Sequence, residues 1–301
     1  MQLHGAFTAL VTPFDSSLRV DEAALDKLVD AQIAGGIAGL VPCGTTGESP
    51  TLDDAEHLSV IERVIKRAKG RVPVIAGTGS NSTREAINLS KRAVDLGADA
   101  VMIVMPYYNR PTQAGLVEHC RLVAAAVPKT KVVLYNVPAR TGCDLLAESV
   151  EAVCKASPNV VAIKEATGNI LRAQELVRRL GDRLTVLSGD DALTLGMMAC
   201  GARGVISVTS NVFPREVQEV CVLSREGKHE EARLAHLSLM PVHDAMFVEA
   251  NPGPVKSALV DAGAIAPFVR PPLVFPGETV RAKVRETIAA YRAPTSTRGV
   301  R

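Results

Sequence analysis

A lysine ends one of the most apolar short runs in the chain. Residues 159–166 read NVVAIKEA, so Lys164 follows a Val- and Ile-rich stretch typical of a strand buried on both faces. Lysine is almost never fully buried without a partner, so the simplest interpretation is a side chain that reaches solvent beyond the strand. The alternative is an amine in a dry pocket, where burial favours the neutral form that attacks a carbonyl carbon.

Further polar residues follow other strand-like runs. In GTTGES (44–49), two glycines flank Thr45 and Thr46, and backbone N–H groups and hydroxyls can converge there on a carboxylate-sized anion. Three more runs end in polar residues: Tyr107 and Tyr108 in PYYN (106–109), Tyr135 and Arg140 in YNVPARTG (135–142), and SGDD (188–191). Each alone fits an ordinary loop residue. Gathered at one end of a sheet, they combine an amine, a phenol, a guanidinium and an anion-binding loop, which predicts a catalytic site.

Imine formation between an amine and a ketone is the chemistry that this set supports. An imine on Lys164 acidifies the adjacent carbon by acting as an electron sink, and Tyr135 is the candidate for moving protons. The Gly/Thr loop would bind an α-carboxylate, which indicates a 2-keto acid. We expect no metal and no cofactor, because the six histidines lack H-x-H or H-E-x-x-H spacing. The residues predict a metal-free Schiff-base lyase or synthase.

Eight strand-like runs, which alternate with helix-like stretches, must position these groups. The runs lie at 6–14, 37–44, 72–79, 98–106, 131–138, 159–166, 184–190 and 204–210. Eight β-then-α units are the pattern of a (β/α)8 barrel, which carries its chemistry at the C-terminal ends of the strands. A doubly wound open sheet is the main alternative, but it would usually show G-x-G-x-x-G after an early strand, and none is present.

The strand signal stops after residue 227. We therefore predict a barrel domain over residues 1–227, a C-terminal helical domain over 228–291 and a disordered tail over 292–301. Pro241 is expected to break or kink the first C-terminal helix.

Two early helices carry start signals. Asp21 is expected to cap the first helix and Gly35 to end it. The second is expected to open at Thr51, with Asp54 three residues later.

The composition makes several partner classes poor candidates. The 301 residues are 47% hydrophobic, which allows a large core, and the net charge of +2 without a Lys/Arg block argues against nucleic acid and anionic membrane. We see no signal peptide in the opening MQLHGAFTALVTPF, and no apolar run approaches the ~20 residues that span a bilayer. Six scattered cysteines without a C-x-x-C pair suit reduced thiols. We expect a cytoplasmic protein.

Four motifs together resemble the dihydrodipicolinate synthases, from the first strand to about residue 291. They are GTTGE (44–48), YNVPARTG (135–142), IKEATGN (163–169) and NPGPVK (251–256). The resemblance implies a (β/α)8 barrel with a small helical C-terminal domain, usually in a homotetramer built from two tight dimers. It also implies condensation of pyruvate with L-aspartate-4-semialdehyde, at the first committed step towards diaminopimelate and lysine.

The resemblance also assigns roles to residues. Lys164 would form the pyruvate imine, Tyr135 and Thr45 would relay protons, and Tyr108 would complete the relay from a neighbouring subunit. The substrate-binding residues would be Thr46 for the pyruvate carboxylate, Arg140 for the carboxylate of the aldehyde substrate, Gly189 as pocket lining and Ile206 beside pyruvate.

Relatives of the same chemistry remain alternatives. N-acetylneuraminate lyases typically show a Ser-Thr pair where this chain has Thr45-Thr46, and they lack an arginine at the position of Arg140. Keto-deoxy-sugar-acid aldolases are harder to exclude, since some carry the Thr pair. A catalytically silent metabolite-binding regulator would usually have lost Lys164 or Tyr135. A phosphate-handling barrel would want a glycine-rich anion site after strands 7 and 8, which SVTSN at 207–211 hardly offers.

Lysine-sensitive members of the family bind the effector at the tight-dimer interface. The matching residues are Ser49, His57, Asn81, Glu85 and Tyr107. Glu85 and Asn81 suit the charged α-amino and carboxylate groups, and His57 can bond the ε-ammonium. Pro50 and Asp54 depart from the residues expected in sensitive members. Inhibition by lysine is an expectation from this resemblance.

Overall fold

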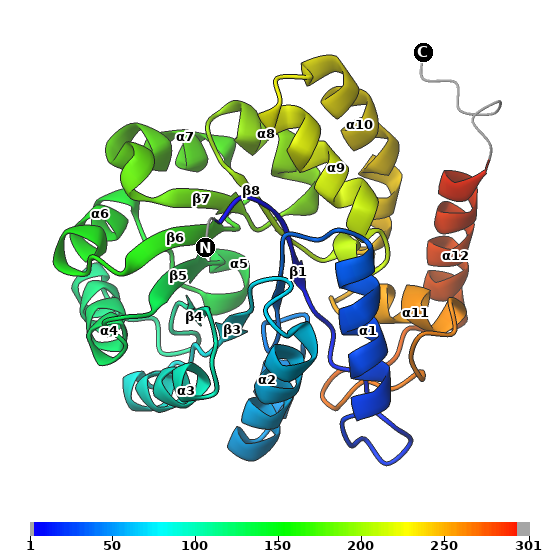
Figure 1. Ribbon diagram of the computed structural model, residues 1–301, viewed down its shortest axis with the longest axis horizontal. Coiled ribbons are helices and arrows are strands. Elements are labelled where there is room, and N and C mark those ends of the chain that lie inside the picture. The colour runs from blue at the N-terminus through cyan, green and yellow to red at the C-terminus, as the bar shows by residue number, and fades with distance from the viewer. Residues whose placement is uncertain (1–2, 294–301) are drawn as a thin grey trace.

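The computed structural model describes residues 3–293 and contains one eight-stranded parallel sheet (Figure 1). Its strands are β1 (Gly5–Ala9), β2 (Gly39–Val41), β3 (Ile75–Gly77), β4 (Ala100–Val104), β5 (Lys131–Asn136), β6 (Val160–Glu165), β7 (Thr185–Ser188) and β8 (Gly204–Ser207). Their order is β2-β1-β8-β7-β6-β5-β4-β3, and a parallel bridge between Leu40 and Val74 joins the two ends. The sheet is therefore a nearly closed (β/α)8 barrel, and all eight predicted strands are confirmed.

The apolar residues of the strands divide between two buried clusters. In β5, Val132 and Leu134 belong to the cluster between the sheet and the helices, whereas Val133 and Tyr135 belong to the cluster inside the barrel. This alternation follows from the two-residue period of a strand. Both faces of each strand are buried, which explains why the strands read as continuous apolar runs in the sequence.

Nine helices among the described residues follow the strands in the barrel part of the chain. They are α1 (Glu22–Ala34), α2 (Asp54–Ala68), α3 (Thr83–Asp95), α4 (Gln113–Ala126), the short α5 (Pro138–Thr141), α6 (Ala147–Ala156), α7 (Ile170–Leu180), α8 (Thr194–Ala199) and α9 (Pro214–Arg225). One turn of 3-10 helix, η1 (Ser49–Thr51), precedes α2. In the described part of the chain, no helix is long and apolar enough to cross a membrane.

One of the two helix starts was predicted correctly. The Asp21 carboxylate caps α1 by accepting from Ala24 N at 3.0 Å, and Gly35 is the C-cap. The prediction for α2 was wrong, because Asp53 and Glu56 form the capping box, with Asp53 Oδ1 accepting from Glu56 N at 2.9 Å. Thr51 ends η1 instead, and its hydroxyl donates to Glu48 O at 2.9 Å.

Three helices follow the barrel: α10 (His229–Ala245), α11 (Gly253–Asp261) and α12 (Glu278–Arg292). Helix α10 packs beside α9, and α12 packs against both α10 and α11 (Figure 1). Pro241 does not break α10, which runs on for four residues beyond it. The domain boundary at residue 227 stays a prediction, and the predicted tail from Pro294 onwards lies outside the described residues.

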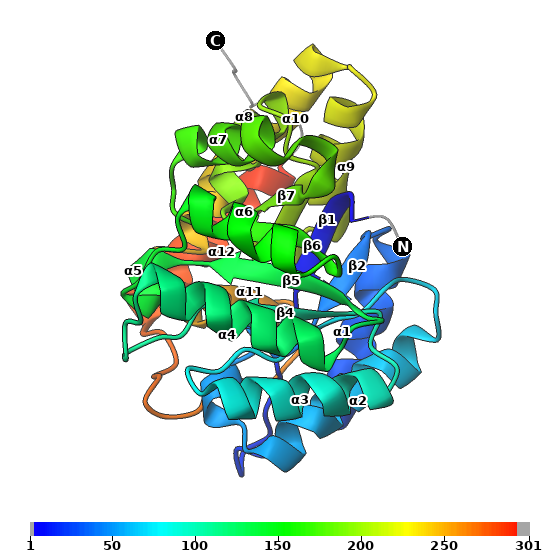
Figure 2. The same ribbon diagram turned by 90° about the vertical axis from the view of Figure 1, so that its left-hand side faces the viewer.

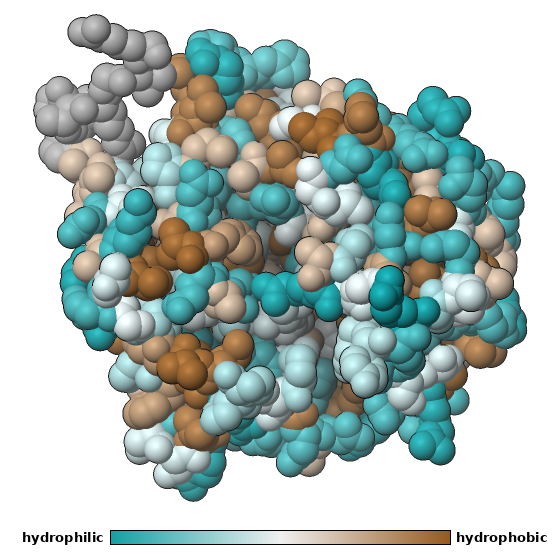
Figure 3. All heavy atoms as spheres, turned by 180° about the vertical axis from the view of Figure 1, so that it is seen from behind, coloured by the Kyte–Doolittle hydropathy of each residue, from teal (hydrophilic) through white to brown (hydrophobic). Residues whose placement is uncertain are grey.

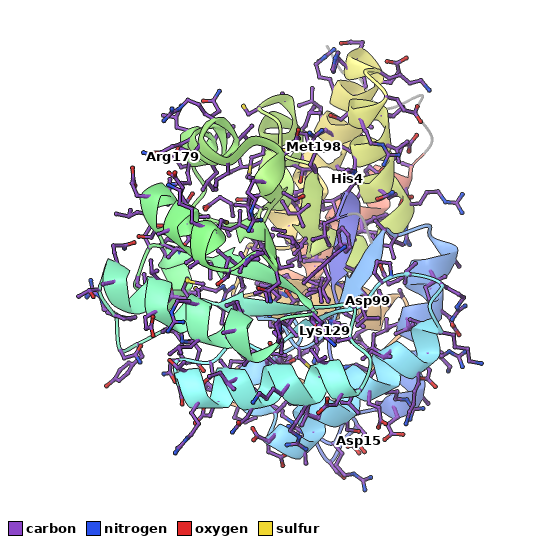
Figure 4. All side chains as sticks on the ribbon, turned by 60° about the vertical axis from the view of Figure 1, so that its left-hand side comes forward. His4, Asp15, Asp99, Lys129, Arg179 and Met198 are labelled. Carbon is purple, nitrogen blue, oxygen red and sulfur yellow. The ribbon has the colours of Figure 1, made fainter. Side chains whose placement is uncertain are left out.

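The two ends of the barrel differ in what they carry. Figure 2 shows the N-terminus at one side and α5, which follows the C-terminal end of β5, at the other. At the N-terminal end, Figure 4 shows His4, Asp99 and Lys129, which closely precede β1, β4 and β5. Figure 3 looks at the molecule from behind, where hydrophilic and hydrophobic residues are intermixed over the surface. The predicted catalytic and substrate-binding residues lie in the C-terminal halves of the strands or follow them, so they belong to the C-terminal end of the barrel.

Candidate active site

Lys164 is buried inside the C-terminal end of the barrel. It lies two residues after the inward-facing Ala162 on β6, so the strand period directs its side chain inward as well. The side chain is only 5% exposed, and its Nζ lies 4.2 Å from the centroid of the Tyr135 ring. Tyr135 and Lys164 are register partners on β5 and β6, so the parallel sheet sets the phenol beside the amine.

A second pair of side chains fixes this register from the other face of the sheet. Asn136 and Glu165 are the next register partners, and Asn136 Nδ2 donates to Glu165 Oε2 at 3.2 Å and to Asp144 Oδ1 at 2.8 Å. Arg172 forms a bidentate pair with Asp144 at 3.0 and 2.9 Å. Burial raises the pKa of the Glu165 carboxyl, and hydrogen bonds from Thr167 oppose the shift. This network holds the strand ends that carry the amine and the phenol.

Sequence reasoning missed the Asn136–Glu165 pair. The available signal was a carboxylate directly after Lys164 at the end of a buried strand, since such a group needs a hydrogen-bond partner.

A cavity of roughly 440 Å³ opens beside Tyr135, the register partner of Lys164. Its lining includes Cys43, Thr45, Ser49, His57, Glu85, Met102, Tyr107, Tyr135 and Arg140. The volume lies within the range of small-molecule sites. The cavity therefore brings the phenol, the guanidinium and one threonine of the predicted set to one space. Lys164 is not among its lining residues and adjoins the cavity through the Tyr135 ring.

The loop GTTGES (44–49) forms one wall of the site. Thr45 is half-buried at the cavity, whereas Thr46 is 2% exposed and is absent from the cavity lining. Close backbone packing requires a glycine in the neighbouring strand, because a Cβ on Gly77 would come within 2.2 Å of Cys43 O. Glu48 has a left-handed backbone with φ of 54°, a conformation that is strained for a residue with a side chain.

The C-terminal segment contacts this loop through three residues, of which Lys256 lies in α11 and the other two lie between helices. Asn251 Nδ2 donates to Thr46 Oγ1 at 3.0 Å, Lys256 Nζ lies 2.5 Å from Glu48 Oε1, and Arg270 N donates to Glu48 Oε2 at 2.9 Å. The side chains of Lys256 and Glu48 are both fully buried.

The buried ion pair depends on both of its partners. Burial lowers the pKa of Lys256 to about 8, although the adjacent Glu48 carboxylate favours the charged amine. Removing one partner of a buried pair typically costs about 3–5 kcal/mol, because the other charge stays buried. The loop is thus held by residues more than 200 positions later in the chain.

Arg140 and Tyr108 lie at the outer edge of the site. Arg140 is exposed on α5 and lines the cavity. Tyr108 is 91% exposed, with a left-handed φ of 71°, and its N–H donates to Thr141 O at 3.3 Å. A large aromatic ring that is held outward on a strained backbone does not contribute to the core of its own chain.

Gly189 and Ile206 are not among the residues that line the cavity. Gly189 N donates to Glu165 O at 2.7 Å, and a Cβ on Gly189 would come within 2.5 Å of Ala166 Cβ. Ile206 is 1% exposed and packs inside the barrel with Tyr135. Close packing against the strand that carries Lys164 accounts for this glycine, and the contacts of both residues with substrate stay predictions.

Four of the five residues expected to bind lysine line the same cavity: Ser49, His57, Glu85 and Tyr107. Asn81 donates instead to Tyr107 O at 3.2 Å. His57 Nε2 lies 2.7 Å from Gly77 O, and burial lowers the pKa of the imidazole. Since a carbonyl only accepts, Nε2 carries the proton, which leaves Nδ1 as an acceptor.

Fold and site together define a (β/α)8-barrel protein with a buried lysine beside a phenol and a cavity at the C-terminal ends of its strands. Among residues 3–293, no three His, Cys, Asp or Glu side chains are arranged to hold a metal ion. The chain belongs to the dihydrodipicolinate synthetase family, whose model matches residues 2–291. The resemblance predicted from the four motifs is confirmed.

Individual relatives cover nearly the whole chain. The chain is 59% identical over 294 residues to the 4-hydroxy-tetrahydrodipicolinate synthase of Sorangium cellulosum strain So ce56, with 97% of each chain covered. The chloride-inhibited dihydrodipicolinate synthase from Acinetobacter baumannii, complexed with pyruvate, has a TM-score of 0.94 at 42% identity, with 96% and 99% covered. The enzyme from Cyanidioschyzon merolae with lysine bound has a TM-score of 0.93 at 37% identity, with 96% and 98% covered.

Proposed function

We propose that the protein is a 4-hydroxy-tetrahydrodipicolinate synthase, a lyase that condenses pyruvate with L-aspartate-4-semialdehyde in the diaminopimelate and lysine pathway. The observation that carries the proposal is the Lys164 amine, 5% exposed and 4.2 Å from the Tyr135 ring, beside a cavity that Arg140 lines. The 59% identity to a relative of that name supports the same activity.

Pyruvate enters the reaction as an imine. The Lys164 nitrogen attacks the ketone carbon, and the carbinolamine that forms loses water to give the imine. In both steps, protons leave the Lys164 nitrogen and reach the oxygen that departs as water. Tyr135 and Thr45 relay these protons. Thr46 and the backbone of its loop bind the pyruvate carboxylate, while Ile206 and Gly189 border the bound pyruvate.

The carbon–carbon bond forms from the enamine. The imine withdraws electrons from the pyruvate methyl group, which loses a proton, and the resulting carbon attacks the aldehyde carbon of the second substrate. The guanidinium of Arg140 binds the carboxylate of that substrate, since it is exposed at the cavity rim and an arginine fork matches a carboxylate bidentately. This chemistry requires no metal and no cofactor.

Arg140→Ala tests the assignment of the second substrate. We expect KM for L-aspartate-4-semialdehyde to rise by roughly 10–100-fold, as lost hydrogen bonds to a charged group predict, while KM for pyruvate changes little. Steady-state kinetics with each substrate varied in turn measure the split. Arg121→Ala, at an exposed arginine paired with Glu118, is the matched control. Equal increases in both KM values would reject the assignment.

The same assay separates the family alternatives. N-acetylmannosamine and glyceraldehyde replace L-aspartate-4-semialdehyde as the aldehyde partner of pyruvate. A preference for either sugar-type aldehyde would make the protein an N-acetylneuraminate lyase or a keto-deoxy-sugar-acid aldolase, with the imine chemistry retained.

The proposal includes a homo-oligomer. The protein forms at least a dimer, and two tight dimers form the complete homotetramer. Tyr108, 91% exposed, then completes the proton relay of a partner subunit. We expect activity to return when subunits carrying Tyr108→Phe are mixed with subunits carrying Lys164→Arg. In such a mixed dimer, one of the two sites has both an intact Lys164 and an intact Tyr108 from the partner. Mass-tagged subunits establish the exchange. No recovered activity in proven mixed oligomers would favour a site built from one chain.

Feedback by L-lysine follows from the residues that share the cavity with Tyr135. Glu85 and Asn81 meet the charged α-amino and carboxylate groups of the ligand, beside Ser49. His57 Nδ1 accepts from its ε-ammonium, and Tyr107 couples the effector to the adjacent Tyr108. Coupling of about 1–3 kcal/mol is typical of such effects.

We expect partial inhibition in millimolar L-lysine and weaker inhibition of Glu85→Thr. Initial rates and calorimetry measure it, with D-lysine as the ligand control. Unchanged activity together with no heat of binding would reject the effector site.

A cytoplasmic location belongs to the same proposal. All six cysteines, which lie within the described residues, are unpaired thiols, as a reducing compartment maintains them.

A further inference from the structure

The NPGPVK segment (251–256) reaches the loop that the proposed function assigns to the pyruvate carboxylate. Asn251 Nδ2 donates to Thr46 Oγ1 at 3.0 Å, across 205 positions of sequence. Asn251 is 6% exposed and Thr46 is 2% exposed, so water hardly competes for this bond. The bond joins the connection between α10 and α11 to the barrel.

The direction of this bond decides what the Thr46 hydroxyl can do. A hydroxyl has one proton to donate and two lone pairs that accept, whereas a carboxylate only accepts. When Thr46 Oγ1 accepts from Asn251, its proton stays available for a further acceptor. If Thr46 donated to the amide oxygen instead, it would present only lone pairs to a substrate carboxylate, and the contact would be repulsive.

Asn251 keeps this contact although its other amide atom is unfavourably placed. Its Oδ1 is one of the few buried side-chain polar atoms without a hydrogen-bond partner in the described part of the chain. Buried polar atoms are almost always paired, so an unpaired one requires an explanation. A role for the Nδ2 group at the site explains why an amide occupies this position.

The same segment, together with Arg270, holds the far end of the loop. Lys256 pairs with Glu48 at 2.5 Å, and Arg270 N donates to the second oxygen of that carboxylate at 2.9 Å. Glu48 is therefore bound on both oxygens, in the left-handed backbone conformation with φ of 54°. With its end fixed in this way, the loop backbone that carries Thr46 cannot move away from Asn251 without breaking a buried ion pair.

We propose that Asn251 is a positioning residue that orients the Thr46 hydroxyl so that its proton is donated to the carboxylate of pyruvate. This inference rests on the proposed function, because it takes pyruvate as the ligand of the loop. Asn251 itself acts through Thr46 and does not touch the substrate.

Asn251→Asp tests the proposal, because it keeps the shape of the side chain and replaces the donor with an acceptor. The Thr46 hydroxyl then donates to the introduced carboxylate and is lost to the substrate. We expect the pyruvate concentration for half-maximal borohydride trapping on Lys164 to rise by roughly 10–100-fold, and KM for pyruvate to rise in step. KM for L-aspartate-4-semialdehyde is expected to change little. Asn169→Asp, at the exposed N-cap of α7, is the matched control, because a carboxylate caps a helix as well as an amide does.

Asn251→Ala and a double-mutant cycle keep the proposal testable if Asn251→Asp does not fold. Removing the donor leaves the hydroxyl free to turn, so Asn251→Ala is expected to weaken trapping less than Asn251→Asp does. In a Thr46→Val background, neither change at Asn251 is expected to weaken trapping further, because the hydroxyl is already absent. Thermal unfolding of every variant separates a loss of folding from a loss of binding.

The outcomes are distinct. Wild-type protein that traps no pyruvate would overturn the proposed function itself. Wild-type protein that traps pyruvate, with folded Asn251 variants that trap it at the wild-type concentration, would overturn only the positioning role. Equal effects of Asn251→Ala in the wild-type and Thr46→Val backgrounds would also overturn it.

Discussion

Lys164→Arg is expected to abolish imine trapping and to lower kcat by roughly 10³-fold or more, as removal of a covalent nucleophile does. The substitution keeps the positive charge, but a guanidinium cannot act as the amine that forms the imine. Incubation with pyruvate and borohydride followed by peptide mapping is expected to place the reduced adduct on Lys164 of the wild-type protein and nowhere else.

A matched substitution controls for the general effect of arginine. Lys155→Arg changes an exposed lysine on α6 that pairs with Glu151, and it is expected to leave kcat and trapping at wild-type values. An adduct on another lysine, or trapping that survives in Lys164→Arg, would disprove the assignment of the nucleophile.

Tyr135→Phe is expected to lower kcat by roughly 10²–10⁴-fold, the range for a positioned acid–base group. The ring that lies 4.2 Å from Lys164 Nζ is kept, so packing around the amine is preserved while the proton relay is lost. Pre-steady-state measurement of imine formation, with pyruvate alone, tests whether the loss falls on the proton-transfer steps.

Tyr291→Phe is the matched control for the lost hydroxyl. Tyr291 packs its ring edge-on against Phe213, with centroids 5.0 Å apart, and phenylalanine retains that contact. Imine formation in Tyr135→Phe at the wild-type rate, with kcat lowered less than tenfold, would remove Tyr135 from the relay.

The barrel could be predicted because its strands are short apolar runs buried on both faces, a pattern that needs no long-range information. The same local logic found Lys164, since a charged residue at the end of such a run requires an explanation. Asp21 was also found from local sequence, because a carboxylate directly before a helix-like stretch is a start signal. Thr51 was mistaken for a cap because hydroxyl and carboxylate residues at 51, 53 and 54 all fit a start signal, and only the turn of η1 selects Asp53.

What the sequence alone did not reveal depends on contacts between distant segments. Asn251 and Lys256 were recognised only as part of a family motif, because no periodicity links them to Thr46 and Glu48. Glu165 was passed over because its role lies in a hydrogen bond to Asn136 on the neighbouring strand. Sequence reasoning therefore identified groups that could do chemistry and missed the groups that hold them in place.

The buried pair between Glu48 and Lys256 also joins residues that translation produces at very different times. The last barrel strand ends at Ser207, and Lys256 is synthesised 49 residues later (256 − 207). At the usual elongation rate of about 5–20 residues per second, this interval lasts roughly 2–10 s. During that time the nascent chain already contains every strand and the nucleophilic amine, but Glu48 lacks its counter-charge and Thr46 lacks its amide donor. Translation thus produces the residues that carry the chemistry before it produces the segment that holds the loop in position.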